Sequence, residues 1–445
     1  MKKFLIVLLS LGLIAAFGMT ASAADVKFGG SYYVVGFYDS NDMLQDTGKA
    51  YSRAAFYQRV RLQPVFQIAE GLTFTARMDA LEKQWGNSNW KGLEDTTSSR
   101  RQTAFVGNPK IQESFEFERG YVSFKTAVGA FDVGYQAAGT WGTVFADSGT
   151  TRPRILYITA AGPVTALAIY EKHFEADTFA VAGWPGKVNA DNDAYYLAGI
   201  YGFKDGSAGL LYAYADFAQW RILGPLAFRT KWHILSPYVK ATFGPVYVES
   251  EVFWVFGKTV AWDNAPAGVQ DVDKNGGAAY LLVKTNLGPA YVGAQVGWSA
   301  GDNNAADNKD STGWGGGADW NPALILMNDG LGTWKPGGNN TANSGKANIL
   351  LYNIFGGFNP TPKLKVEAAL TVASNDKKQQ LAGVDFVSKK LGTEFDVTAT
   401  YKIYDNLSYM VGAGYLWTGD AFKGTNSATV IGNDYLLMNK LSLSF

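Results

Sequence analysis

The chain has no cysteine and only two histidines, His173 and His233, among its 445 residues. Without cysteine it can form neither a disulfide nor a thiolate metal site, and it cannot attach a c-type haem covalently. Histidine-dependent phospholipases and proteases need that residue positioned beside a nucleophile or a water molecule, and neither histidine lies in such a motif. We therefore predict no cofactor and no enzymatic activity.

An excess of one charge is also missing, because 39 basic residues balance 39 acidic ones. Nucleic acid binding requires a basic surface, so no nucleic acid partner is expected. Beyond residue 23 the chain has no apolar run long enough for a transmembrane helix, and no long stretch of helical periodicity. These absences exclude a helical membrane protein and disfavour a large soluble domain.

Export is predicted from the first residues. Two lysines precede an apolar run from Phe4 to Phe17, and the small residues 21–23 form an A-x-A cleavage pattern. The run is shorter than the roughly 20 residues that a transmembrane helix needs. We expect residues 1–23 to be a cleaved signal peptide and residues 24–445 to form the mature domain.

What is abundant is aromatic residues (14%), glycine (51 residues) and strands of alternating polarity. In residues 55–68, one face carries Phe56, Val60, Leu62, Phe66 and Ile68, and the other carries Tyr57, Arg59, Arg61, Gln63 and Gln67. One such strand would also suit a soluble sandwich. Charged residues on the polar faces of many strands instead favour a water-filled interior.

The spacing of turns predicts the strand number. Short turns fall at residues 69–71, 127–130, 162–163, 205–206, 244–245, 288–289, 359–362 and 405–406. Longer polar or glycine-rich stretches fall near 39–53, 82–113, 139–153, 172–193, 216–228, 258–277, 299–347, 373–390 and 418–432. Eight turns and nine loops join eighteen strands, with 16–20 as the accepted range. The fold class is therefore all-β: a closed antiparallel transmembrane β-barrel with short periplasmic turns and long external loops.

The last strand ends in a phenylalanine on its apolar face. The residues Tyr435, Leu441, Leu443 and Phe445 share that face. This ending resembles the membrane-insertion signal of Gram-negative outer-membrane proteins, which implies the cell outer membrane as location and the barrel-assembly machinery as partner.

Charged residues at inward positions are candidates for lining a pore or its constriction. They are Arg59, Arg61, Arg77, Asp79, Arg119, Glu249, Glu251, Glu394 and Asp396. A barrel of 16–18 strands leaves an aqueous lumen in which such charges stay solvated. Four early arginines facing Glu249 and Glu251 across the barrel would orient small polar solutes. The alternative is a solvated wall with no selectivity role.

Two stretches carry resemblances to known families. Residues 118–126 and 129–136 (ERGYVSFKT and GAFDVGYQ) resemble the early strand pair of general bacterial porins. The resemblance implies that residues 139–154 fold into the lumen, with Asp147 as an acidic constriction residue and Arg152 and Arg154 near its base. The acidic-aromatic-glycine core usual in that loop is absent here.

The C-terminal third is similar to alginate-export-type barrels and deltaproteobacterial porins. The carrying segments are residues 299–302, 319–322, 391–396, 401–407 and 418–420. This resemblance implies eighteen strands and an arginine-lined lumen, although this chain is only partly arginine-lined.

Two loops remain as further candidates. Asp271, Asp273 and Asn275 resemble the start of a calcium loop, but Leu282 stands where an EF-hand needs glutamate. Residues 299–347 form a long external loop or lid.

The predicted function is an outer-membrane channel for passive diffusion of small hydrophilic solutes or ions. The alternative is a scaffold barrel that sheathes an export or electron-transfer partner, as in a porin–cytochrome assembly. Expected partners are outer-membrane lipid, lipopolysaccharide and small hydrophilic solutes, and a homotrimer is left open.

Overall fold

The computed structural model describes residues 25–44, 46, 52–85, 115–175, 189–265, 267–304, 307–313, 317–328 and 346–445, with the backbone alone for 222–225. The predicted signal peptide, residues 1–23, lies outside the described residues.

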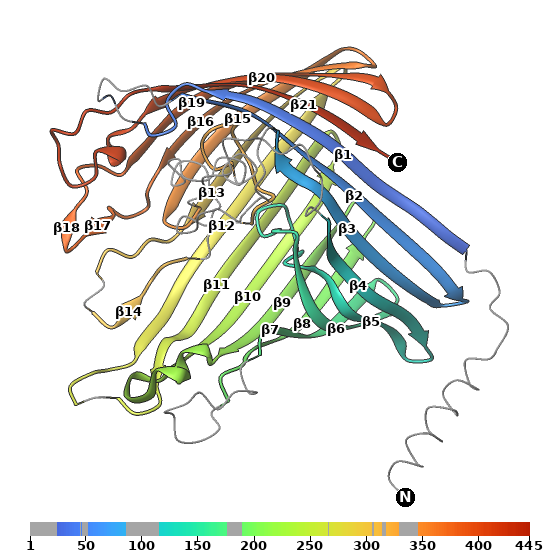
Figure 1. Cartoon of the computed structure of the whole chain (residues 1–445), viewed down its shortest axis with the longest axis vertical. Coiled ribbons are helices and arrows are strands. Elements are labelled where there is room, and N and C mark those ends of the chain that lie inside the picture. The colour runs from blue at the N-terminus through green and yellow to red at the C-terminus, as the bar shows by residue number, and fades with distance from the viewer. Residues whose placement is uncertain are drawn as a thin grey trace, which may run out of the picture.

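Eighteen long strands form one closed antiparallel barrel (Figure 1), which confirms the predicted fold class and strand number. The strands are β1 (Asp25–Asp39), β2 (Arg53–Ala69), β3 (Leu72–Gln84), β4 (Phe115–Thr126), β5 (Gly129–Ala138), β6 (Thr150–Ala161), β7 (Val164–Phe174), β8 (Asn192–Phe203), β9 (Gly206–Phe217), β10 (Phe228–Phe243), β11 (Val246–Trp262), β12 (Val272–Leu287), β13 (Ala290–Ser299), β15 (Ile349–Thr361), β16 (Leu364–Ser374), β19 (Lys390–Tyr404), β20 (Leu407–Thr418) and β21 (Asp434–Ser444). The first strand pairs with the second on one side and with the last on the other, so the main sheet has no free edge.

The connections alternate between two lengths, as the turn spacing predicts. Eight connections contain two residues each, for example Glu70 and Gly71 between β2 and β3. Gly71 has a φ of 72°, a left-handed conformation that glycine adopts at little cost. The nine connections at the other end are longer. Both chain ends of the barrel therefore lie on the short-turn side.

Short elements occur in the long connections. They are β14 (Lys309–Asp310), β17 (Gln380–Leu381), β18 (Val384–Asp385) and the 3-10 helices η2 (Gln219–Leu226) and η3 (Asp420–Lys423). Among the described residues, no helix combines the length and the apolar character needed to cross a membrane.

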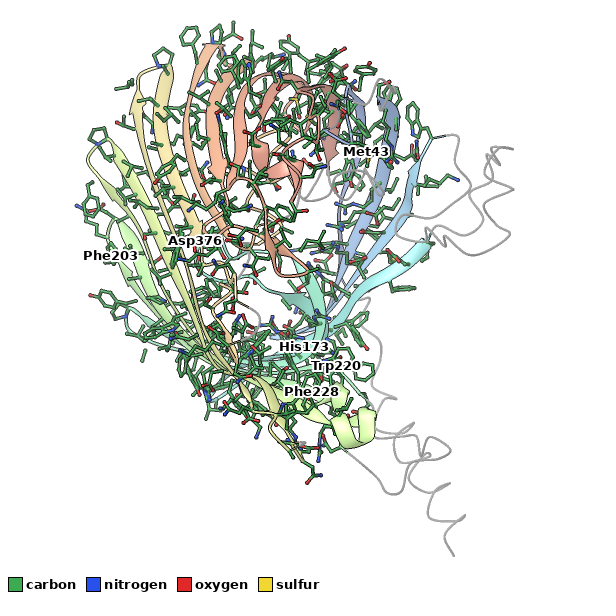
Figure 2. All side chains as sticks on the ribbon, turned by 90° about the vertical axis from the view of Figure 1, so that its left-hand side faces the viewer. Met43, His173, Phe203, Trp220, Phe228 and Asp376 are labelled. Atoms are coloured by element: carbon green, nitrogen blue, oxygen red, sulfur yellow. The ribbon has the colours of Figure 1, made fainter. Side chains whose placement is uncertain are left out.

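The two faces of the strands differ as the alternation predicts. On β19, Phe395 and Val397 are exposed on the outer surface. Glu394, which precedes Phe395 and points to the interior, is 0% exposed. Figure 2 shows Phe203 on the outer surface, Trp220 on η2 and Phe228 close to this helix. An outer surface of apolar and aromatic side chains suits a hydrocarbon environment. The closed ladder suits it as well, because no strand edge is left with unpaired backbone groups.

Part of the interior is packed instead of open. Residues 139–149, which join β5 to β6, and residues 317–328, from the connection between β13 and β15, contact inward-facing wall residues. Phe145, Trp320, Ile325 and Leu326 from these segments are each at most 2% exposed. We call the two segments together the septum.

Candidate functional site

A wall of arginines is built on β2, β3 and β4. The strand register places Arg61 opposite Asp79 and Arg77 opposite Arg119. Arg59 lies two positions before Arg61 and therefore on the same inward face. The predicted cluster of early arginines thus forms from neighbouring strands.

Asp79 is the acidic centre of this wall and is 1% exposed. Arg61 binds it through two hydrogen bonds, Nε to Oδ1 at 2.7 Å and Nη2 to Oδ2 at 2.6 Å. Arg59 and Arg77 contact carboxylates at longer distances. Arg59 lies 3.8 Å from Asp79 and 3.7 Å from Glu82, and Arg77 lies 3.9 Å from Asp79. The charge of Asp79 is therefore mainly committed to Arg61.

Two cations of the site have no carboxylate partner in the part of the chain that the structure describes. They are Arg119 and Lys440, the latter on β21. The Lys440 ammonium lies 5.4 Å from the centroid of the Tyr33 ring, and the Arg59 guanidinium lies 4.9 Å from the same centroid. Tyr33 thus provides a shared π surface for two cations.

These cations surround a cavity of about 870 Å³ between the wall and the septum. The septum contributes Ser148, Gly149, Asp319, Asn321 and Leu324 to the cavity lining. The barrel strands contribute the rest of the lining. It consists of the four arginines, Lys440, Asp79, Glu82 and Glu118, together with apolar residues that include Met410 and Met438. The cavity therefore lies between a basic surface of the barrel and the septum, and Asp319 is the acidic residue that the septum contributes to its lining.

The two segments of the septum are joined by backbone hydrogen bonds. The Gly317 N–H donates to the Phe145 carbonyl at 2.5 Å, and the Asp319 N–H donates to the Asp147 carbonyl at 2.9 Å. The Phe145 ring lies 5.1 Å from the Trp320 ring and stacks on Tyr280 of the wall at 5.2 Å. The two segments therefore form one packed unit.

Contacts with the wall and with a lysine complete this unit. The Trp320 indole N–H donates to Gln295 Oε1 on β13 at 2.9 Å. Gly297 makes room for that ring, because a Cβ there would lie 2.4 Å from it. Lys346, which is 3% exposed, donates to the Gly317 carbonyl at 2.7 Å and to the Trp320 carbonyl.

Asp147, the acidic residue implied by the porin resemblance, lies in the septum but not among the residues that line this cavity. Its Oδ1 accepts the Trp141 N–H at 2.8 Å. Burial raises the pKa of the Asp147 carboxyl above its ordinary value, and the neighbouring Asp319 acts in the same direction. Asp319 belongs to the second septum segment, residues 317–328. The turn-rich sequence around it (Asp319-Trp320-Asn321-Pro322) gave no sign that it would line the cavity.

Arg152 and Arg154 lie on β6, away from the cavity. The Arg154 guanidinium donates to the Ala137 carbonyl at 2.7 Å and lies 3.8 Å from Glu171. Arg152 pairs in register with Gln136. The structure therefore does not bring these two arginines together with the wall on β2, β3 and β4.

The later carboxylates are buried, although the sequence suggested solvated positions. Glu249 accepts the hydroxyls of Tyr247 at 2.7 Å and Tyr280 at 3.0 Å. Glu251, Glu394 and Asp396 are 1%, 0% and 4% exposed, respectively. The reason is that the septum covers the wall where these three lie, and its backbone N–H groups donate to them.

The remaining candidates lie away from the lumen site. Tyr435 and Phe445 are exposed on the outer surface, and the Phe445 carbonyl accepts the Gly30 N–H at 2.8 Å. Leu441 and Leu443 pair in register with Val34 and Tyr32 of β1.

The candidate calcium ligands are engaged by other groups. Asp273 lies 2.6 Å from Lys258, and Asp271 lies 3.6 Å from it. Asn275 accepts the Trp254 indole N–H at 2.8 Å. Within the described ranges, no group of three or more histidine or acidic side chains is arranged to hold a metal ion.

No protein-family model matches the chain. No curated protein matches it either. Solved structures with the same fold do exist. They include OccAB3 of Acinetobacter baumannii (12% identity, 94% of this chain and 100% of that one, TM-score 0.52). Two more come from Pseudomonas aeruginosa. OccK2 (OpdF), in complex with glucuronate, has 12% identity over 94% of this chain and 98% of that one, with a TM-score of 0.51. The outer membrane protein opdK has 11% identity over 94% and 99%, with a TM-score of 0.50. The chain thus has the fold of Gram-negative outer-membrane channels.

Proposed function

We propose that the protein is an outer-membrane channel for passive diffusion of small hydrophilic solutes, and that its cavity favours anions. The carrying observation is the arginine wall, in which Arg119 and Lys440 face the cavity without a carboxylate partner among the described residues. Export by a cleaved signal peptide and insertion by the barrel-assembly machinery belong to the same proposal. So do contacts with outer-membrane lipid and lipopolysaccharide.

The register of the arginine wall supports the preference for anions. Arg77 and Arg119 are directly opposed across β3 and β4. Like charges at such positions repel each other, and an anion between them relieves that repulsion. Arg59, Arg77 and Arg119 all line the cavity, so their guanidinium groups can donate to a carboxylate or phosphate there.

The size of the cavity suits small solutes. Its volume of about 870 Å³ falls within the range of sites that take small molecules. OccK2, which shares the fold, was solved in complex with glucuronate, a small organic anion. A scaffold barrel that sheathes a partner protein needs a free lumen, and the septum between β11 and β19 disfavours that alternative.

Planar bilayers test the proposal directly. Purified protein should show stepwise conductance and a reversal potential on the anion side in a salt gradient. Replacing both unpaired cations (Arg119→Ala with Lys440→Ala) should lower the anion-to-cation permeability ratio about fivefold, as expected for loss of roughly 1 kcal/mol of Coulomb attraction.

The control is Lys204→Ala, which removes a lysine from the exposed turn between β8 and β9. It should leave the reversal potential at the wild-type value. Protein that is folded but silent in the bilayer would reject the channel. An unchanged permeability ratio in the double variant would reject the anion preference alone.

A further inference from the structure

Three buried carboxylates on the inner wall lack a cation. In the part of the chain that the structure describes, Glu251 on β11 and the pair Glu394 and Asp396 on β19 form no ion pair with lysine, arginine or histidine. A carboxylate removed from water costs several kcal/mol unless other donors replace its hydration. The hydrogen-bond donors that replace water at these three carboxylates therefore indicate the role of the residues.

At β11 the donors come mainly from the first septum segment. Glu251 Oε2 accepts the Thr143 N–H at 2.7 Å and the Thr143 hydroxyl at 2.8 Å. Its Oε1 accepts the Ser236 hydroxyl of β10 at 3.0 Å. Gly142 permits this approach, because a Cβ there would lie 2.7 Å from Oε2. The carboxylate therefore fits the backbone of this loop closely.

At β19 the donors are three successive backbone N–H groups of the second segment. Leu324 donates to Asp396 Oδ2 at 3.2 Å, Ile325 to Glu394 Oε1 at 2.6 Å and Leu326 to Glu394 Oε2 at 2.7 Å. The two successive N–H groups of Ile325 and Leu326 converge on one carboxylate, that of Glu394, as in an anion-binding nest. Met327, the next residue, has a φ of 58°, a left-handed conformation that turns the chain after the nest.

We infer that Glu251 and Glu394, with Asp396, are positioning residues that fix the septum across the lumen and thereby set the width of the cavity opposite the arginine wall. The two attachments act on one body, because the segments share backbone hydrogen bonds and the contact between Phe145 and Trp320. Ser148, Gly149, Asp319 and Leu324 of this body line the cavity. The effect on permeation rests on the proposed channel function, but the attachment itself does not.

The experiment compares Glu251→Gln and Glu394→Gln with the matched control Glu249→Gln. Glu249 lies on the same strand and face as Glu251 and is 8% exposed. Among the described residues its hydrogen bonds go to the wall tyrosines Tyr247 and Tyr280 and not to the septum, which it reaches indirectly through the stacking of Tyr280 on Phe145. Glutamine keeps the size of glutamate but turns one acceptor into a donor. In Glu394→Gln that donor faces a backbone N–H, so at least one of the two hydrogen bonds is lost.

Hydrogen–deuterium exchange of the septum peptides is the first measurement, because it does not depend on conduction. Amides of residues 317–328 should exchange roughly tenfold or more faster in Glu394→Gln, and amides of 139–149 likewise in Glu251→Gln. Because the segments are joined, each variant should also accelerate exchange in the other segment. Wild-type rates in both variants, or equal acceleration in Glu249→Gln, would overturn the inference.

Single-channel recording is the second measurement. Each of the two variants should show a larger unitary conductance or added conductance levels, whereas Glu249→Gln should not. Faster exchange with unchanged conductance would show that the septum is attached as described but does not set the width, which overturns that part of the inference. If wild-type protein does not conduct, the channel proposal fails while the exchange result still decides the attachment.

Discussion

At the scale of single residues, charge alone does not identify the groups that face the cavity. Asp147 and Asp319 both lie in the septum, yet only Asp319 is among the residues that line the cavity. The Asp147 carboxylate instead accepts the Trp141 N–H. The acidic group that opposes the arginines is therefore contributed by the second segment.

This difference predicts the relative effects of two isosteric substitutions. Asp319→Asn removes a negative charge beside the arginine wall and should raise the anion-to-cation permeability ratio, by about two- to fivefold at the Coulomb energies of a hydrated site. Asp147→Asn keeps the acceptor for Trp141 and should change the ratio less. Reversal potentials in a salt gradient measure both. A larger change in Asp147→Asn would place the constriction at Asp147 instead.

At the scale of elements, the septum depends on close approach of two backbones. A Cβ at Gly317 would lie 1.9 Å from the Asp147 carbonyl oxygen, so no other residue fits without separating the segments. The ladder hydrogen bonds of the barrel run from strand to strand and do not involve Gly317. Damage at Gly317 should therefore loosen the septum and leave the barrel intact.

Gly317→Ala tests this point against Gly199→Ala. Gly199 lies on β8, where an added Cβ meets no atom within 4 Å. Gly317→Ala should destabilise the septum by about 1–3 kcal/mol, the usual cost of an added methyl group in a packed site. Faster amide exchange in residues 139–149 and 317–328 reports the loss, and unchanged heat-modifiable migration on gels reports an intact barrel. Equal exchange in the two variants would contradict the close contact.

At the scale of the whole molecule, stability depends on closure of the sheet. The last strand completes the ring by pairing with β1 from Ser31 to Asp39 and with β20 from Leu407 to Leu416. Without it two strand edges are left unpaired, and in hydrocarbon each unpaired backbone group costs several kcal/mol.

Deletion of residues 434–445 should therefore abolish the heat-modifiable folded form almost completely. Deletion of residues 380–385, which removes the β17–β18 hairpin, is the control. In the described part of the chain, β17 and β18 pair only with each other, and the Phe386 N–H already donates to the Gln379 carbonyl at 2.8 Å, so the cut ends lie together. A folded barrel without residues 434–445, detected in outer-membrane fractions, would contradict the role of closure.

The sequence by itself determined the barrel. Alternation along a strand has a period of two residues, and turns are formed by neighbouring residues, so both are local properties. The apolar set from Phe56 to Ile68 and the turn at Gly71 therefore predicted strand, face and connection. Counting such turns gave the eighteen strands that the structure shows.

Only the tertiary structure decided which inward charges meet water. Glu251 meets Thr143 across 108 residues, and Glu394 meets Ile325 across 69. The pattern around each glutamate is that of an ordinary inward position, because alternation specifies the face of a strand but not what covers it. The arginine wall was foreseen because its residues lie on consecutive strands. The septum was not, because it forms from two distant loops whose packing no local pattern records.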